Sequence, residues 1–159
     1  HGGVAMGSEI SGGIRNVTIR SCLMDNENWS PLRFKSQPSR GGTVENITFE
    51  DITIKGARSI FDINMEWRMV PPISPAHYPL TCLRNIHFKN INGEAQSAGT
   101  MYGFKEAPFG NDTFFFENCH IKAQKGLSIS NVANVNFKGL ELEIKEGEKI
   151  YERSANKDK

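Results

Sequence analysis

Apolar and polar residues alternate along most of the chain, and the alternation recurs in one short pattern. An apolar residue is followed two positions later by Asn, then by two apolar residues separated by one position, and then by polar residues and a further apolar position. Alternation rich in β-branched and aromatic residues favours strands over helices. The copies are IRNVTIRSC from Ile14, VENITFEDI from Val44, LRNIHFKNI from Leu83, DTFFFENCH from Asp112 and VANVNFKGL from Val132.

Copies of this pattern start roughly twenty to forty residues apart, which is typical of a solenoid with loops of varying length at fixed corners. One repeat is too small to bury its own apolar face, but stacked coils pair all their strands and bury a continuous apolar column. The sequence therefore predicts an all-β, parallel β-helix. Each Asn of the pattern would lie at the same bend of successive coils, where its side chain bonds the backbone and the next copy. These residues are Asn16, Asn46, Asn85 and Asn134, with Thr113 in the Asn position of one copy.

An ordinary β-sandwich with asparagines in its turns is the alternative fold, because sandwiches also consist of short strands at regular spacing. Within the β-helix, we expect residues 1–147 to form the coils and residues 148–159 to form a charged tail or a truncated last coil. Two segments interrupt the rhythm and are predicted insertions. They are the segment Met65–Leu80, with four prolines that prevent ladder pairing, and the Gly-containing segment Ala95–Tyr102.

Composition narrows the function classes. The 19 basic and 18 acidic residues give a net charge of +1, which offers no strong field for nucleic acid or a membrane surface. No stretch reaches the roughly 18 apolar residues of a membrane helix. The three cysteines, Cys22, Cys82 and Cys119, have no metal-ligand spacing and are expected to be free, buried thiols.

Several segments together carry a resemblance to a known family. HGGVAMGSE at the start, RFK at Arg33–Lys35, SQPSRGG at Ser36–Gly42, VENITFEDITI and KEAPF follow one another in the order found in family 28 of the glycoside hydrolases, the polygalacturonases and their relatives. The chain resembles this family from residue 1 to about residue 144. The resemblance implies a right-handed parallel β-helix, in agreement with the repeat.

The resemblance also implies a chemistry. Members of the family hydrolyse α-1,4-galacturonan or rhamnogalacturonan with inversion, which needs one carboxyl group as acid and a second as base about 6.5–9.5 Å away. In the family these groups belong to Asn-Thr-Asp and Asp-Asp motifs upstream of Gly-His-Gly, and neither motif occurs here. We therefore expect a C-terminal portion, truncated at its N-terminal side and inactive as an isolated fragment. No metal or organic cofactor is expected.

Arg33 and Lys35 are the strongest candidates for substrate binding. Residues two apart on a strand point to the same face, so the two cations project together while Phe34 points into the core. Galacturonan carries a carboxylate on every sugar, and a guanidinium grips a carboxylate bidentately while an ammonium adds a point charge. The resemblance assigns this pair to the substrate carboxylate beside the scissile bond.

The other candidate residues are weaker. His1 matches a histidine that the family places beside the catalytic aspartates, where an imidazole tunes the acid's protonation. Gly2 belongs to a tight turn that brings the backbone near the substrate. Trp67 lies about one coil beyond Lys35, where the family often has a substrate-contacting tyrosine, and is a candidate for stacking on a sugar. Two loop residues, Glu9 and Arg40, are candidates for a sugar hydroxyl and a second carboxylate.

Several functions remain open on the sequence. The leading one is a secreted or periplasmic galacturonan hydrolase, monomeric when full length, whose partner is acidic polysaccharide and neither nucleic acid nor a membrane. A rhamnogalacturonan or other uronate-glycan hydrolase is the nearest alternative. Pectate lyases share the β-helix but hold calcium with clustered carboxylates, whereas the acids here are scattered. A non-catalytic, carbohydrate-binding or adhesive stem is the third class.

Overall fold

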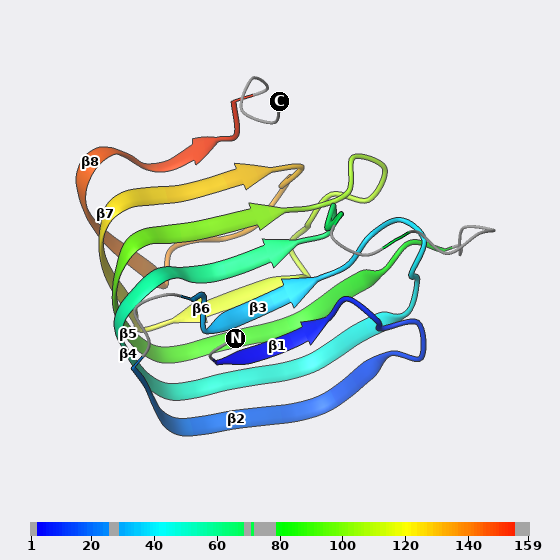
Figure 1. The fold of residues 1–159 in the computed structure, drawn as a ribbon, viewed down its shortest axis with the longest axis horizontal. Helices are drawn as coiled ribbons and strands as arrows, with labels where there is room; N and C mark the ends of the chain where they lie inside the picture. The colour runs from blue at the N-terminus through cyan, green and yellow to red at the C-terminus, as the bar shows by residue number, and fades with distance from the viewer. Residues whose placement is uncertain (1–2, 26–28, 69–70, 72–78, 155–159) are drawn as a thin grey trace.

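The computed structural model describes residues 3–25, 29–68, 71 and 79–154, and every regular element in this part of the chain is a β-strand. All the strand pairs are parallel, and the strands climb in coils from the N-terminus to the C-terminus (Figure 1). This confirms the parallel β-helix. The strands are β1 (Val4–Gly7), β2 (Ile14–Asp25), β3 (Leu32–Lys35), β4 (Thr43–Asn64), β5 (Cys82–Tyr102), β6 (Phe114–Glu117), β7 (Cys119–Ser130) and β8 (Leu140–Glu152).

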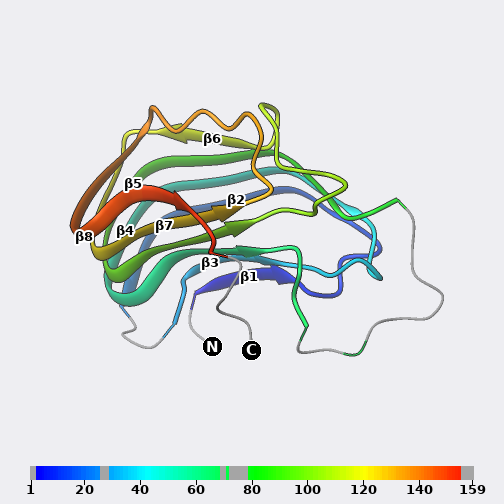
Figure 2. The ribbon, with the colours of Figure 1, turned by 90° about the horizontal axis from the view of Figure 1, so that it is seen from above.

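Long strands bend at the corners, so that one strand contributes to more than one side of the coil (Figure 2). We call the side made by β1, β3 and the C-terminal parts of β4, β5, β7 and β8 the β1 stack. The side made by β6 and the N-terminal parts of β2, β4 and β5 is the β2 stack. Successive register partners in the β1 stack are Val4, Leu32, Phe61, Gly99, Leu127 and Ile150.

A ladder of aromatic rings fills the interior behind the β2 stack. Phe49 and Phe88 stack with ring centroids 5.4 Å apart, and Phe88 stacks on Phe116 at 5.3 Å. Phe137 continues the ladder at 5.7 Å from Phe116. Parallel pairing without a register slip places the same side-chain position of each coil above the last, so offset-stacked rings follow directly from the repeat.

Asparagines form the bend that precedes the β2 stack. Asn16, Asn46 and Asn85 all have positive φ, between 54° and 58°, a conformation that Asn tolerates better than most residues. The Asn46 side-chain amide donates to Asn16 at 2.9 Å, and that of Asn85 donates to Asn46 at 2.7 Å. The predicted alignment is correct for these three residues. Asn134 lies above Thr113 in the next coil, as the β7–β8 register and the Phe116–Phe137 stack indicate, but it lacks the positive φ of the other three residues, so the expected bend does not form there.

A second ladder lies five positions further along each coil, and the sequence pattern did not reveal it. Ser21, Asp51, Asn90 and Asn118 also have positive φ. The Asn90 side chain donates to Asp51 at 2.9 Å, and the Asn118 side chain donates to Asn90 at the same distance. Two such bends per coil separate the β2 stack from its neighbours and fix the cross-section of the solenoid.

The predicted insertions have different outcomes. Ala95–Tyr102 is no insertion but the C-terminal part of β5, whose residues pair with β4 and β7. Only part of Met65–Leu80 belongs to the described residues, and β4 ends just before it, at Asn64. Strand β8 continues past position 147 and pairs with β7 as far as Glu152. The last described coil therefore includes residues that the sequence leaves open as a charged tail or a truncated last coil.

The asparagine ladder predicts a specific cost of substitution. Asn46→Ala in the full-length protein forces alanine into the left-handed region and removes two side-chain bonds, so we expect unfolding free energy to fall by about 1–3 kcal/mol. Asn46→Gly keeps the backbone conformation and should cost less. Urea denaturation measures both, with Asn92→Ala, an exposed strand asparagine without positive φ, as the control. Equal effects of Asn46→Ala and Asn92→Ala would contradict the ladder.

Candidate functional site, a groove across the β1 stack

An open groove of about 430 Å³ lies on the outer surface of the β1 stack. Its floor consists of strand residues from β3, β4 and β5, and its walls consist of Trp29 before β3, Arg58 on β4 and Trp67 after β4. A hollow of this size accommodates a small part of an extended ligand. The lining residues are Trp29, Ser30, Arg33, Arg58, Ser59, Asp62, Trp67, Ser97, Gly99 and Thr100.

Strand β3 places Arg33 and Lys35 on the outer face. Phe34 between them is only 1% exposed and belongs to the core, as the alternation predicts. Arg33 is in register with Asp62 on β4, and Asp62 is in register with Thr100 on β5. The groove floor therefore presents a cation, a carboxylate and a hydroxyl on three successive coils.

Trp67 brings the two cations together. The Arg33 guanidinium carbon lies 5.4 Å from the centroid of the Trp67 ring, and Nζ of Lys35 lies 5.0 Å from the same centroid. The Trp67 backbone N–H donates to the Ser36 carbonyl at 2.8 Å, which holds the residue just beyond the end of β3. Contacts of this kind stabilise a cation by about 0.5–2 kcal/mol, depending on exposure. The predicted cation pair and the predicted aromatic residue thus form one cluster.

Arg33 is also paired within the protein. Its Nε lies 2.8 Å from Oδ2 of Asp62, with 8% and 23% of the two side chains exposed. The Nε–H makes no hydrogen bond, so the contact is an ion pair without the alignment of a hydrogen bond. A half-buried carboxylate beside a buried guanidinium fixes the position of the Arg33 side chain and reduces its free charge.

The opposite wall of the groove consists of Trp29 and Arg58. The Arg58 backbone N–H donates to the Trp29 carbonyl at 3.3 Å, so the two residues lie on adjacent coils. Next to them, the hydroxyls of Ser30 and Ser59 contact each other, and Ser59 is in register with Ser97. Hydroxyls at the same position on three coils give this wall a polar base.

The remaining predicted residues lie elsewhere or outside the described part of the chain. His1 and Gly2 are outside the described residues. Glu9 and Arg40 do not line the groove; an Arg40 amino group lies 3.7 Å from a Glu9 oxygen, and Arg40 is buried. The structure explains why residue 7 is glycine. Gly7 has a φ of 106°, and a Cβ there would lie 1.9 Å from the Lys35 carbonyl oxygen. Only glycine therefore lets β1 pack against β3 at this point.

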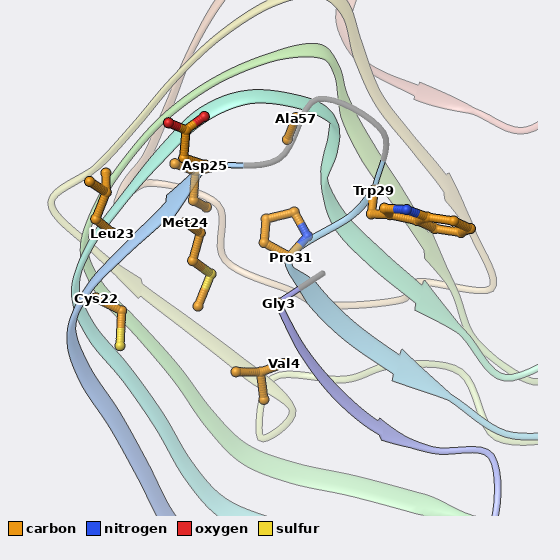
Figure 3. A pocket seen from close by; sticks show the side chains of 10 residues that line it. Gly3, Val4, Cys22, Leu23, Met24, Asp25, Trp29, Pro31 and Ala57 are labelled. Carbon is orange, nitrogen blue, oxygen red and sulfur yellow. The ribbon is translucent and has the colours of Figure 1, made fainter. Parts of the chain in front are cut away.

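A second hollow, of about 420 Å³, opens beside the first coil (Figure 3). Its lining is largely apolar, with Val4, Met24 and Pro31 around it and Leu23 62% exposed at its rim. The Trp29 indole extends away from Val4 and Met24 in this view, although the residue lines both hollows. The charged residue in this lining is the acidic Asp25, which does not suit an anionic ligand, whereas the groove is lined by Arg33 and Arg58.

The outer face of the β2 stack differs from the groove in its charges. Arg15 and Arg84 contact the two oxygens of Glu45, each at 2.6 Å. The hydrogen bond from Arg84 lowers the pKa of Glu45, with further contributions from Arg15. On this face cation and carboxylate neutralise each other across three coils, whereas Lys35 in the β1 stack has no carboxylate within ion-pair distance among the described residues.

Two further properties concern the described residues as a whole. Residues 3–25, 29–68, 71 and 79–154 contain no cluster of three or more His, Cys, Asp or Glu side chains that could hold a metal ion. Over the same residues, no helix has the length and apolar character needed to cross a membrane. Cys22, Cys82 and Cys119 are free thiols as expected, but only Cys119 of the three is buried, and Cys82 is exposed. Desolvation of the sulfur raises the pKa of both Cys82 and Cys119.

Sequence reasoning found Arg33, Lys35 and Trp67 but missed Asp62, Trp29 and Arg58. Asp62 follows Arg33 by 29 residues and precedes Thr100 by 38, so unequal loops conceal their common register. Aligning the apolar runs LRF and FDI as successive coils would have revealed Asp62. Trp29 lies outside the regular alternation of the strands, and Arg58 lies at a bend of β4. No periodic signal therefore marks either residue.

A parallel β-helix with a polar, cation-bearing groove across its coils defines a solenoid protein that presents an extended binding surface. Comparison with known sequences then gives the family. The profile described as "Glycosyl hydrolases family 28" matches residues 1–140, and the chain belongs to this family.

Two polygalacturonases are similar to this chain. That of Ralstonia solanacearum is 35% identical over 106 residues, covering 65% of this chain and 20% of the relative. That of Ralstonia nicotianae is 37% identical over 65 residues, covering 38% of this chain and 12% of the relative. The matched part thus represents a fifth or less of each curated relative.

The Arg33–Asp62 pair predicts a measurable coupling. Asp62→Asn leaves the buried guanidinium without its counter-ion, so we expect the unfolding free energy to fall by about 1–3 kcal/mol, less than for a fully buried pair because Asp62 is partly exposed. Arg33→Gln should lose less when Asp62→Asn is already present. A double-mutant cycle by urea denaturation measures the interaction, and additive effects of the two changes would contradict it.

Proposed function

We propose that the full-length protein hydrolyses α-1,4-linked galacturonan with inversion, and that this chain supplies its substrate-binding groove. The observation that carries the proposal is the convergence of Arg33 and Lys35 on Trp67, where Arg33 and Trp67 line the groove and Lys35 lies beside it. Membership of glycosyl hydrolases family 28 and the similarity to two polygalacturonases support it. The same family membership supports a secreted or periplasmic protein that acts as a monomer.

The cluster suits a sugar that carries a carboxylate. Lys35 offers an ammonium without an internal carboxylate partner among the described residues, and the guanidinium of Arg33 adds a second cation beside it. The indole of Trp67 offers an apolar face for the C–H side of a pyranose ring. One uronate residue thereby meets charge and stacking surface together, and a neutral sugar would offer Lys35 no carboxylate in exchange for its hydration.

Asp62 positions Arg33 for this task. The carboxylate contacts Nε, one edge of the guanidinium, and in the proposed complex the terminal amino groups of Arg33 bind the substrate carboxylate. An internal counter-ion also lowers the cost of keeping a guanidinium at 8% exposure when no substrate is bound. Arg33 is thus held in one conformation before binding, which reduces the entropy lost when the complex forms.

The bond-breaking groups in this proposal lie outside the chain. Inversion requires a carboxylic acid to protonate the leaving oxygen and a carboxylate to activate water on the opposite side of the ring. Upstream coils of the full-length protein supply both groups, and His1, at the start of this chain, tunes the protonation of the acid. Residues of the groove bind and orient the glycan beside those groups.

The proposal predicts the effect of removing each cation. In the full-length protein acting on polygalacturonate, Lys35→Ala removes a charged contact of about 1.5–3 kcal/mol, and kcat/KM should fall about 10- to 100-fold. Arg33→Lys keeps the charge but loses the planar guanidinium, so kcat/KM should also fall, by a smaller factor. Arg33→Ala should lose most turnover. Steady-state kinetics measures these changes.

Lys122→Ala is the matched control, because it removes an equally charged side chain from an exposed position of β7 outside the groove. Unchanged kcat/KM in Lys35→Ala and Arg33→Ala would overturn the carboxylate assignment. Unsaturated product and loss of activity with a chelator would identify a lyase instead. Glycan binding without any cleavage by the full-length protein would favour a non-catalytic stem, and faster cleavage of rhamnogalacturonan would correct the substrate.

A further inference from the structure

We infer that Arg58, with Trp29, forms a second uronate-binding position on the wall of the groove opposite Trp67. This inference rests on the proposed function, because it assigns a further carboxylate contact to the same acidic glycan. Arg58 and Trp29 both line the groove together with Arg33 and Trp67. A ligand that fills the groove would therefore meet both walls.

The two walls are separated along the strand direction. Arg58 precedes Asp62 by four residues on β4, a distance of at most about 13 Å, and Trp67 follows the end of the same strand. The hydroxyls of Ser30, Ser59 and Ser97 and the Arg33–Asp62 pair occupy the floor between them. The cations in contact with the Trp67 ring are Arg33 and Lys35, so we assign Arg58 to a position of its own.

Arg58 differs from the other groove arginine in being available to a ligand. Its side chain is exposed, and no carboxylate lies within ion-pair distance of it among the residues that the structure describes. Arg33, by contrast, is 7% exposed and paired with Asp62. A guanidinium without an internal partner gains most from a carboxylate supplied by a ligand, since the full bidentate contact is new.

Trp29 supplies the apolar half of this position. It is 38% exposed beside Arg58, whose backbone N–H donates to the Trp29 carbonyl. An indole and a guanidinium therefore line the same wall, and a ligand there meets the same two groups that Trp67 and Arg33 offer elsewhere in the groove. Each wall thus offers one aromatic surface and at least one cation.

Two facing positions suit a chain of uronates better than a single acidic sugar. Neighbouring sugars in such a chain are rotated relative to each other, so successive carboxylates leave it in different directions. A groove with cations on one wall alone would bind only the carboxylates that point to that wall. Arg58 on the second wall contacts a neighbouring carboxylate, and the glycan is held at two points instead of one.

Kinetics of the full-length protein on polygalacturonate tests this inference. Arg58→Ala should raise KM about 3- to 10-fold with kcat within about twofold, because the contact lies away from the cation pair and contributes to binding alone. Arg58→Lys should recover part of the loss. The difference from wild type should shrink at high salt, as expected for an exposed charge pair. Lys55→Ala, which removes an exposed cation three residues earlier outside the groove, should leave KM unchanged.

The outcomes separate the two proposals when wild type and Arg58→Ala are also titrated with rhamnogalacturonan fragments. If wild type cleaves polygalacturonate and the KM of Arg58→Ala equals that of wild type or of Lys55→Ala, the second position is overturned and the proposed function stands. If wild type binds only another uronate glycan and Arg58→Ala weakens that binding, the position stands and the galacturonan assignment falls. If wild type binds no uronate glycan, both are overturned.

Discussion

Parallel pairing that keeps its register from coil to coil, apart from shifts between Ile54 and Ala57 and between Lys125 and Leu127, is the constraint on which the structure depends. It aligns each interior position above its predecessor, so that Phe49, Phe88 and Phe116 stack, and it aligns each exterior position in the same way. The left-handed residues at two bends per coil keep this register, since each turns the chain at the same point and bonds its neighbour. Interior packing and exterior chemistry therefore have a common cause.

The groove is a product of the same register. Arg33, Asp62 and Thr100 come from different strands and follow loops of unequal length, yet the ladder brings them into one row. Loops at the corners then add the aromatic walls, Trp29 before the strands and Trp67 after them. A solenoid separates these tasks: the strands fix spacing along the axis, while the corners vary without disturbing the core. In the proposed function, specificity for a charged polymer thus comes from few side chains on a rigid support.

Sequence reasoning reached the fold because the alternation and the asparagine spacing survive variation in loop length. It named Arg33, Lys35 and Trp67 as candidates. Arg33 and Lys35 came from strand periodicity together with the family resemblance, and Trp67 came from its place about one coil beyond Lys35. It missed Asp62 and Arg58 because their relation to Arg33 is set by coil register, which a linear pattern with unequal loops does not display. It erred at Asn134 and at Ala95–Tyr102, where the motif or the small residues gave a local signal that the stacking of neighbouring coils overrides.

The most direct test is a crystal structure of the full-length protein, with its hydrolysis blocked, bound to an oligogalacturonate. The groove across the β1 stack should hold the glycan along the solenoid axis, with one uronate carboxylate in hydrogen-bond contact with both Arg33 and Lys35 and its ring against Trp67. A glycan bound on the β2 stack, or in the groove with its carboxylates turned away from residues 33 and 35, would contradict the assignment of this surface.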